Sequence, residues 1–298
     1  MHTGRFLGTF SVFGLFLLAA APARGTESRW TGERVACGTC HEQILKDFRP
    51  TVHGKAMEFV VAGKDVTCGS CHAGDLAKHM ETADPTLVRN PRKEKADVVA
   101  EKCLTCHATD RHLILWRGSQ HQTAGVACLS CHSVHHPSAD RKLLAKRTEA
   151  ETCFSCHGNV RKTMLQRSTH LFRDERGVSR IQCYSCHNPH GSQTERLISA
   201  NSINDKCYEC HQEKRGPFLW EHAPVRENCM NCHTPHGSNN EQLLSLRRPQ
   251  LCQSCHLQGR HQTVAGRPNA MFNINRMCQN CHTQVHGTNH PSGPILQR

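Results

Sequence analysis

Ten copies of the motif Cys-x-x-Cys-His run through the chain, and together they use all 20 of its cysteines. This motif attaches c-type haem: the two thiols bind the porphyrin covalently, and the adjacent imidazole binds the iron. A zinc site would need four ligands from two such pairs and would not require the fixed histidine. Disulfide bonds would not require it either. We therefore predict ten covalently bound haems.

The predicted haem-binding residues follow directly from the motifs, which we number 1 to 10 in chain order. The cysteines, in pairs, are Cys37 and Cys40, Cys68 and Cys71, Cys103 and Cys106, Cys128 and Cys131, Cys153 and Cys156, Cys183 and Cys186, Cys207 and Cys210, Cys229 and Cys232, Cys252 and Cys255, and Cys278 and Cys281. The motif histidines, predicted as the first iron ligands, are His41, His72, His107, His132, His157, His187, His211, His233, His256 and His282.

The remaining histidines repeat around the even-numbered motifs, each of which has one histidine upstream and one downstream. These pairs are His53 and His79, His121 and His135, His170 and His190, His222 and His236, and His261 and His286. They supply one second ligand for each of ten irons. His135 or its neighbour His136, and His121 or His112, are alternatives that the sequence leaves open.

A histidine three residues after a motif histidine lies on the proximal side of its own haem and cannot reach the opposite face. We therefore predict that His190 and His236 bind neighbouring haems, so that the repeat is a two-haem unit occurring five times. The methionines show no repeated offset from the motifs. With two histidines on every iron, the reduction potentials should be low and no coordination position is left for a substrate.

Aromatic residues make up only 5% of the chain, so the porphyrins must supply much of the interior. The connections between motifs are rich in Gly, Pro, Ser and Asn. The predicted fold is a multihaem cytochrome c: mostly irregular, with short α-helices, little or no β-structure, and an elongated row of ten haems. Candidate helices are Arg92–Cys103 and Lys142–Cys153.

The formal net charge of +12 would ordinarily suggest a nucleic acid or an anionic membrane as partner. Each haem brings two ionised propionates, and a ferric bis-imidazole centre adds about +1, so each haem contributes about −1. The haem-loaded protein is then close to neutral. The basic residues are better explained as counter-charges to propionates, and no nucleic-acid partner is predicted.

The first 23 residues have the pattern of a secretory signal peptide. Arg5 precedes an apolar run, and Ala21-Pro22-Ala23 forms a cleavage site. No cysteine occurs before Cys37, so we expect no lipid anchor. The predicted organisation is a signal peptide at 1–23 and a single decahaem domain at 24–298, exported to the periplasm without a membrane anchor of its own.

The ten motifs and the segment from Glu213 to Pro224 resemble the MtrA/DmsE family of periplasmic decahaem cytochromes, which includes MtoA and PioA. The repeated Cys-His-x-Pro-His-Gly-Ser at 186–192 and 232–238 fits that pattern. Two departures are that His79 follows its motif histidine by seven residues and that His286 follows by four.

The resemblance implies an elongated haem wire that inserts into an outer-membrane β-barrel of MtrB type. Electrons would pass between a periplasmic or inner-membrane quinol-linked cytochrome and the cell exterior, with or without an extracellular multihaem cytochrome. Either extracellular metal reduction or Fe(II) oxidation fits such a wire. The alternatives are a freely soluble periplasmic electron shuttle or store and a multihaem reductase, which would need an open iron.

Overall fold

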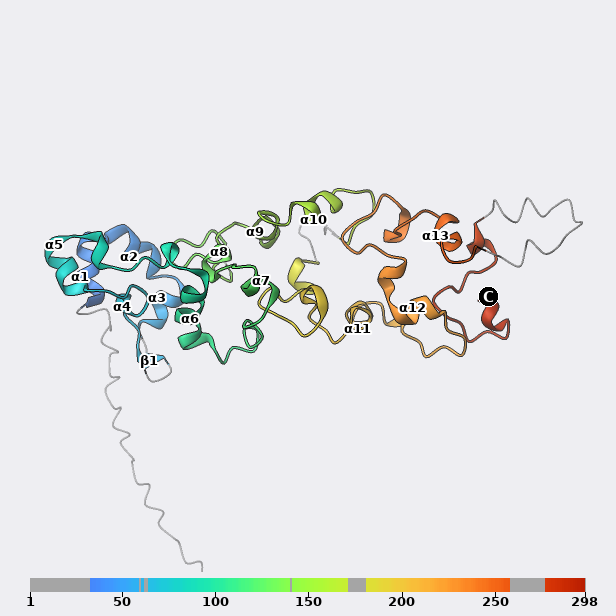
Figure 1. Ribbon diagram of the computed structural model, residues 1–298, viewed down its shortest axis with the longest axis horizontal. Helices are drawn as coiled ribbons and strands as arrows, with labels where there is room; N and C mark the ends of the chain where they lie inside the picture. Colours follow the sequence, from blue (N-terminus) through green and yellow to red (C-terminus); the bar gives the residue numbers. More distant parts are fainter. Residues whose placement is uncertain are drawn as a thin grey trace, which may run out of the picture.

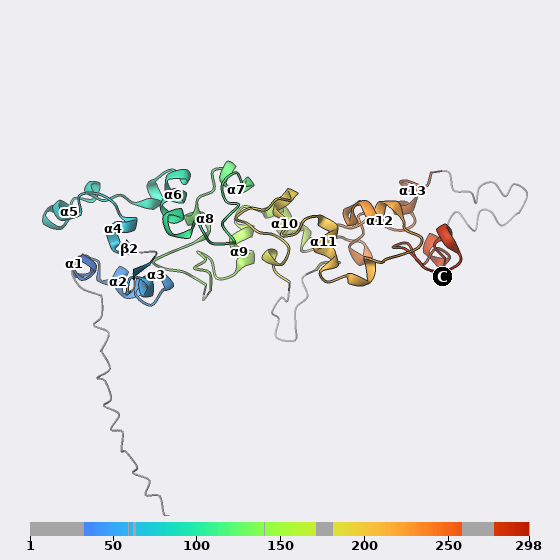
Figure 2. The same ribbon diagram turned by 90° about the horizontal axis from the view of Figure 1, so that it is seen from below.

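The computed structural model describes residues 33–58, 60–61, 64–139, 141–170, 181–257 and 277–297. This part of the chain forms an elongated molecule with α1 (Glu33–Cys40) near one end and the C-terminal residues at the other (Figure 1). Beyond α6 (Ala96–His107) the chain advances toward the C-terminal end, whereas α5 (Leu76–Thr82) lies at the same end as α1 in both views (Figure 1, Figure 2). The predicted elongated, mostly irregular fold is confirmed.

Short helices and single helical turns make up almost all of the regular structure. The α-helices after α1 are α2 (Glu42–Phe48), α3 (Val52–Ala56), α4 (Cys68–Cys71), α5 (Leu76–Thr82), α6 (Ala96–His107), α7 (Gln120–Thr123), α8 (Cys128–Cys131), α9 (Glu149–Phe154), α10 (Gly158–Thr163), α11 (Ile203–Tyr208), α12 (Ala223–Glu227) and α13 (Gln250–Gln253). The 3₁₀ turns are η1 (Pro85–Leu87), η2 (Pro91–Lys93), η3 (Cys183–Ser185), η4 (Glu195–Leu197), η5 (Gln212–Lys214), η6 (Cys229–Asn231), η7 (Glu241–Leu243), η9 (Cys278–Asn280) and η10 (Gly293–Ile295). The strands β1 (Val60–Val61) and β2 (Lys64–Asp65) pair antiparallel over two residues each.

The two helices that we predicted from the sequence are present with shifted boundaries. α6 begins at Ala96 because Pro91 starts a separate 3₁₀ turn, and it continues through motif 3. α9 begins only at Glu149, where the hydroxyl of Thr148 accepts a hydrogen bond from the Glu151 N–H and caps the helix. The segment before it is not helical, because Lys142 and Leu143 both have left-handed backbone angles.

Side chains alone build very little core. Two small clusters occur in the described chain, one around Phe48 and Met57 and one around Ala100, Leu104 and Trp116. No large side chain among the described residues is completely shielded from solvent. None of the helices in the described part of the chain has the length and hydropathy of a membrane span.

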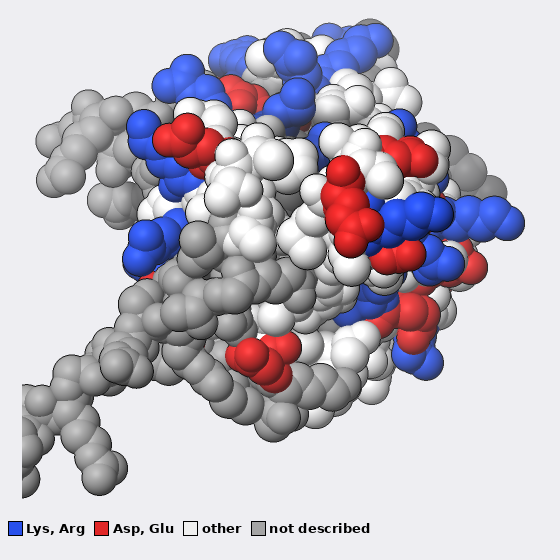
Figure 3. Space-filling model, turned by 90° about the vertical axis from the view of Figure 1, so that its left-hand side faces the viewer, with Lys and Arg blue, Asp and Glu red and all other residues white. Residues whose placement is uncertain are grey.

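The surface charges at the end that carries α1 and α5 are of both signs. Lys and Arg are the more frequent there, with Asp and Glu placed among them (Figure 3). Ion pairs also occur elsewhere in the described chain, such as Lys102 with Glu94 at 3.0 Å.

Candidate haem sites

Every Cys-x-x-Cys-His motif is built on one helical turn. In nine motifs the histidine N–H donates to the carbonyl of the first cysteine at 2.8–3.0 Å, and motif 3 lies inside α6. This i to i−4 bond places both sulfurs and the imidazole on one short stretch of backbone. No disulfide joins any of the 20 cysteines, so all of the thiols are available for covalent attachment.

The motifs line one continuous cavity that runs through the molecule. Its volume is about 4560 Å³, and all ten motif histidines line it. A pocket for a single small ligand has a volume of roughly 300–1,000 Å³. The cavity is therefore large enough for several porphyrin-sized groups held end to end.

Nine motif imidazoles face a second imidazole across this cavity in the described part of the chain. The pairs are His41–His79, His72–His135, His107–His53, His132–His190, His157–His121, His187–His236, His211–His170, His233–His286 and His256–His222, with ring centroids 5.6–6.4 Å apart. An iron midway would lie about 3 Å from each centroid, which leaves about 2.0–2.1 Å for the bond to the ring nitrogen, the usual metal–imidazole length. The spacing fits a bis-imidazole iron.

The pairing follows a regular rule along the chain. The histidine upstream of an even motif faces the next odd motif, as His121 faces His157. The histidine downstream of an even motif faces the preceding even motif, as His190 faces His132. At the N-terminal end, where there is no earlier motif, His79 faces His41 instead. The tenth extra histidine, His261, lies outside the described residues.

The local repeat Cys-His-x-Pro-His-Gly allows a histidine of one two-motif unit to face the motif histidine of the preceding unit. A Cβ on Gly191 would overlap the carbonyl oxygen of Leu115, and one on Gly237 would overlap that of Thr163. Only glycine allows the loop to approach the preceding segment so closely. That approach places His190 and His236, one residue earlier in each loop, beside the preceding even motif and away from their own.

Backbone carbonyls orient one ring in eight of the nine facing pairs. The Nδ1 atoms of His72, His79, His121, His132, His170, His187, His222 and His233 lie 2.7–3.1 Å from carbonyl oxygens, and Nδ1 of His282 lies 2.6 Å from another. A carbonyl can only accept, so Nδ1 carries the proton and Nε2 is left with its lone pair. This is the usual outer-shell arrangement of a metal-binding histidine.

Left-handed residues supply three of these carbonyls. Lys142, Arg196 and Gln242 have φ of 64°, 59° and 57° and accept from the histidines of motifs 4, 6 and 8. Such angles are uncommon for residues other than glycine and are typical of functional constraint when they recur. A leucine follows each of them in the sequence, but no residue type signals the carbonyl itself.

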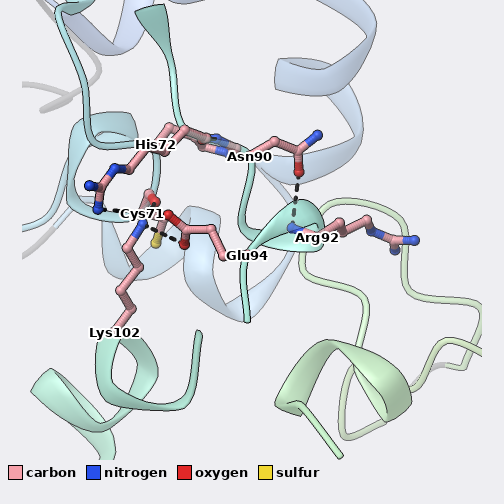
Figure 4. A network of polar contacts seen from close by, with 7 residues as sticks. Cys71, His72, Asn90, Arg92, Glu94 and Lys102 are labelled. Carbon is pink, nitrogen blue, oxygen red and sulfur yellow. Dashed lines mark hydrogen bonds and ion pairs between the residues drawn. The ribbon is translucent and has the colours of Figure 1, made fainter. Parts of the chain in front are cut away.

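At motif 2, too, a backbone carbonyl orients the motif imidazole, and a polar network surrounds it (Figure 4). The Arg89 carbonyl lies 3.1 Å from Nδ1 of His72. Lys102, which directly precedes motif 3, donates to the Cys71 carbonyl at 3.2 Å and pairs with Glu94 at 3.0 Å. Glu94 also lies 3.8 Å from the Arg89 guanidinium. The network therefore joins the backbone of motif 2 to the helix that carries motif 3.

Burial favours the neutral form of six of the second histidines. Burial is the main cause that lowers the pKa of His53, His135, His190, His222, His236 and His286, and it brings His190 and His286 to about 4. A neutral imidazole is the form that binds a metal. All six belong to the set that we predicted as second ligands.

The structure also distinguishes between the histidines that the sequence left as alternatives. His135 faces the motif 2 imidazole, whereas Nδ1 of His136 lies 3.1 Å from the carboxylate of Asp47. His121 faces the motif 5 imidazole, and His112 contributes its backbone to hydrogen bonds with Asp110 and Asn188.

Two tryptophans differ in exposure. Trp116 is buried beside His190, while Trp220 is 42% exposed.

Comparison with known proteins agrees with this geometry. The family model for a doubled CXXCH motif matches residues 121–162, 177–216 and 222–261, and the model for cytochrome c7 and related cytochrome c matches residues 25–108. The chain is 42% identical over 278 residues to the multihaem cytochrome MtrA of Shewanella baltica (strain OS185), an alignment that covers 88% of this chain and 80% of the relative.

The chain belongs to the MtrA family of multihaem cytochromes. As a member of the MtrA family it binds haem c covalently through its CXXCH motifs, transfers electrons and is not an enzyme. Each doubled-motif match contains an even motif and the following odd motif. In the first and last matches, the upstream histidine and the odd motif histidine that it faces lie within the same match.

Proposed function

We propose that this chain binds ten haems, each with two histidine ligands. The main observation behind this proposal is the set of facing imidazole pairs. Nine irons would take the described pairs, and His282 would pair with His261, the one extra histidine left by the repeat. The supporting features are the centroid spacing, the Nδ1–carbonyl hydrogen bonds and the cavity between the rings. The mature protein would be the single domain at 24–298 after removal of residues 1–23.

The ten haems would form one unbranched row in sequence order. The cysteine sulfurs of successive motifs lie close enough to influence one another electrostatically at every junction after the first, which supports this arrangement. Between an odd motif and the following even motif, the first cysteines interact: Cys103 with Cys128, Cys153 with Cys183, Cys207 with Cys229 and Cys252 with Cys278. Between an even motif and the following odd motif, the second cysteines interact: Cys71 with Cys106, Cys131 with Cys156, Cys186 with Cys210 and Cys232 with Cys255. At the first junction, α1 contacts α4.

The row would conduct electrons across the outer membrane from the periplasm. Its support is the membership of the MtrA family together with a long, narrow molecule that places motif 1 and motif 10 near opposite ends (Figure 1). The partners would be an outer-membrane β-barrel of MtrB type around the wire and a quinol-linked cytochrome at its periplasmic end. An extracellular cytochrome or a soluble metal ion would exchange electrons at the other end.

Reconstitution in liposomes tests the conduit. The purified complex of this cytochrome with its barrel should pass electrons from an external reductant to an enclosed redox dye, and liposomes with the barrel alone should not. Equal rates in the two preparations would overturn the conduit. The mass of the purified cytochrome should exceed that of the signal-cleaved chain by ten haems, and eight or fewer would overturn the ligand set.

A further inference from the structure

One carboxylate lies between two haem-attachment sites in the middle of the chain. Glu149 begins α9, and a carboxylate oxygen lies within 4.8 Å of Sγ of both Cys153 and Cys183. These are the first cysteines of motifs 5 and 6. Among the described residues, no other group of His, Cys, Asp or Glu gathers three potential metal ligands so closely. With both sulfurs converted to thioethers by haem attachment, the group would hold no metal ion and would leave a fixed negative charge.

The position of this carboxylate is set by the backbone of motif 6. The Tyr184 N–H donates to Oε1 of Glu149 at 2.7 Å, a charge-assisted hydrogen bond that holds the carboxylate in place. The Glu149 side chain is only 16% exposed. Water therefore screens its charge weakly in the direction of the two sites.

The next two-motif unit has a neutral group in the comparable place. There the Cys229 N–H donates to the side-chain oxygen of Asn204 at 2.8 Å, and Asn204 is 8% exposed. An amide makes the same kind of backbone hydrogen bond without a net charge. The charge at motifs 5 and 6 is thus not needed for the turn that it caps.

Lys142 provides a partial counter-charge. Its Nζ lies 3.8 Å from Oε2 of Glu149 and 3.3 Å from the centre of the Tyr184 ring, and the lysine side chain is 53% exposed. An exposed ammonium is well hydrated and screened, so it cancels only part of the field of a more buried carboxylate. A net negative field should remain at the two attachment sites.

We propose that Glu149 lowers the reduction potentials of haems 5 and 6, so that this pair forms an electrostatic step in the middle of the row. Reduction adds an electron to each haem, and a nearby negative charge opposes it; charge and hydrogen bonding around the site are established controls of haem potential. At an effective dielectric constant of about 20, a unit charge roughly 10 Å from an iron changes its one-electron equilibrium constant by roughly tenfold. This inference rests on the proposed ten-haem function.

Redox titration of the purified haem-loaded protein, followed by absorbance, tests the step. The variant Glu149→Gln keeps an acceptor for the Tyr184 N–H and removes the charge, so two of the ten one-electron steps should move to higher potential. Glu151→Gln is the matched control: it removes the same charge from the same helix at an exposed position, and its titration should coincide with the wild type. Identical titrations for Glu149→Gln and the wild type would overturn the proposal.

A second variant decides the question if Glu149→Gln does not mature. Lys142→Gln removes the counter-charge and should move the same two steps to lower potential, the opposite direction. A shift to higher potential, or none, would contradict the proposal. Haem mass is measured on the wild type and on every variant. Eight haems or fewer in the wild type refute the haem assignment itself, whereas ten haems with unshifted potentials in the variants refute only the role of Glu149.

Discussion

Replacing His190 with alanine should leave one particular iron, that of motif 4, without its second ligand. The His190 ring lies 6.1 Å from that of His132, with the ring planes 13° apart, although His190 follows the motif 6 histidine by only three residues. One haem in ten should become high-spin, so the low-spin signal in magnetic circular dichroism should fall by about one tenth. Added imidazole should restore it, since the substitution leaves an open coordination position.

Removing haem 4 itself identifies which iron is affected. The double substitution Cys128→Ala and Cys131→Ala should reduce the mass by one haem and leave nine low-spin irons. In that background, His190→Ala should produce no high-spin signal, because its iron is already absent. A high-spin signal that persists there would mean that His190 serves another haem, and the pairing rule would be refuted. His136→Ala is a suitable control in both backgrounds, because that ring lies against Asp47.

Three further predictions concern the neighbours of the haem sites. His121→Ala should yield one high-spin haem in ten, whereas His112→Ala should leave all ten low-spin; the reverse result would exchange their assignment. Glu94→Gln should lower the free energy of unfolding by about 1–3 kcal/mol, between the values for exposed and buried ion pairs, because it leaves the largely buried Lys102 ammonium without an opposite charge. Denaturant titration of the haem-loaded protein measures this, and adding Lys102→Met should recover part of the loss. Arg196→Val should destabilise the protein by about 1–2 kcal/mol, because a β-branched residue is strained at φ 59°, whereas Arg196→Gly should not. Equal thermal unfolding of these last two variants would argue against backbone strain at this position.

The sequence predicted the family and the elongated fold because their signal is local. A Cys-x-x-Cys-His motif needs one helical turn, and ten of them determine the composition of the interior. The prediction that His190 and His236 cross to a neighbouring site was also local, since it depended on a three-residue reach. Their positions in the structure agree with that reasoning, although ligation itself stays a prediction.

The choice of partner could not be predicted, because it depends on contacts between segments far apart in the chain. His135 and His136 are equivalent in the sequence, and only the packing of His135 against Phe48 and its position opposite His72 distinguish them. The backbone carbonyls that accept hydrogen bonds from the motif histidines could not be predicted for another reason. Left-handed backbone is normally signalled by glycine or asparagine, and here Lys142, Arg196 and Gln242 adopt it. For the same reason α9 begins later than predicted: the segment before it contains the left-handed Lys142.

The crossing of histidines between units restricts how such a chain can change in length during evolution. Deleting one motif with its flanking histidines would disturb the alternation and leave irons one ligand short. Deleting an adjacent even and odd motif together, with the histidines around the even one, would preserve it: His236 would then stand where His190 now faces motif 4. Wires of this kind should therefore gain or lose haems in twos, at interior positions. The N-terminal end, where His79 departs from the rule by facing motif 1, should remain unchanged.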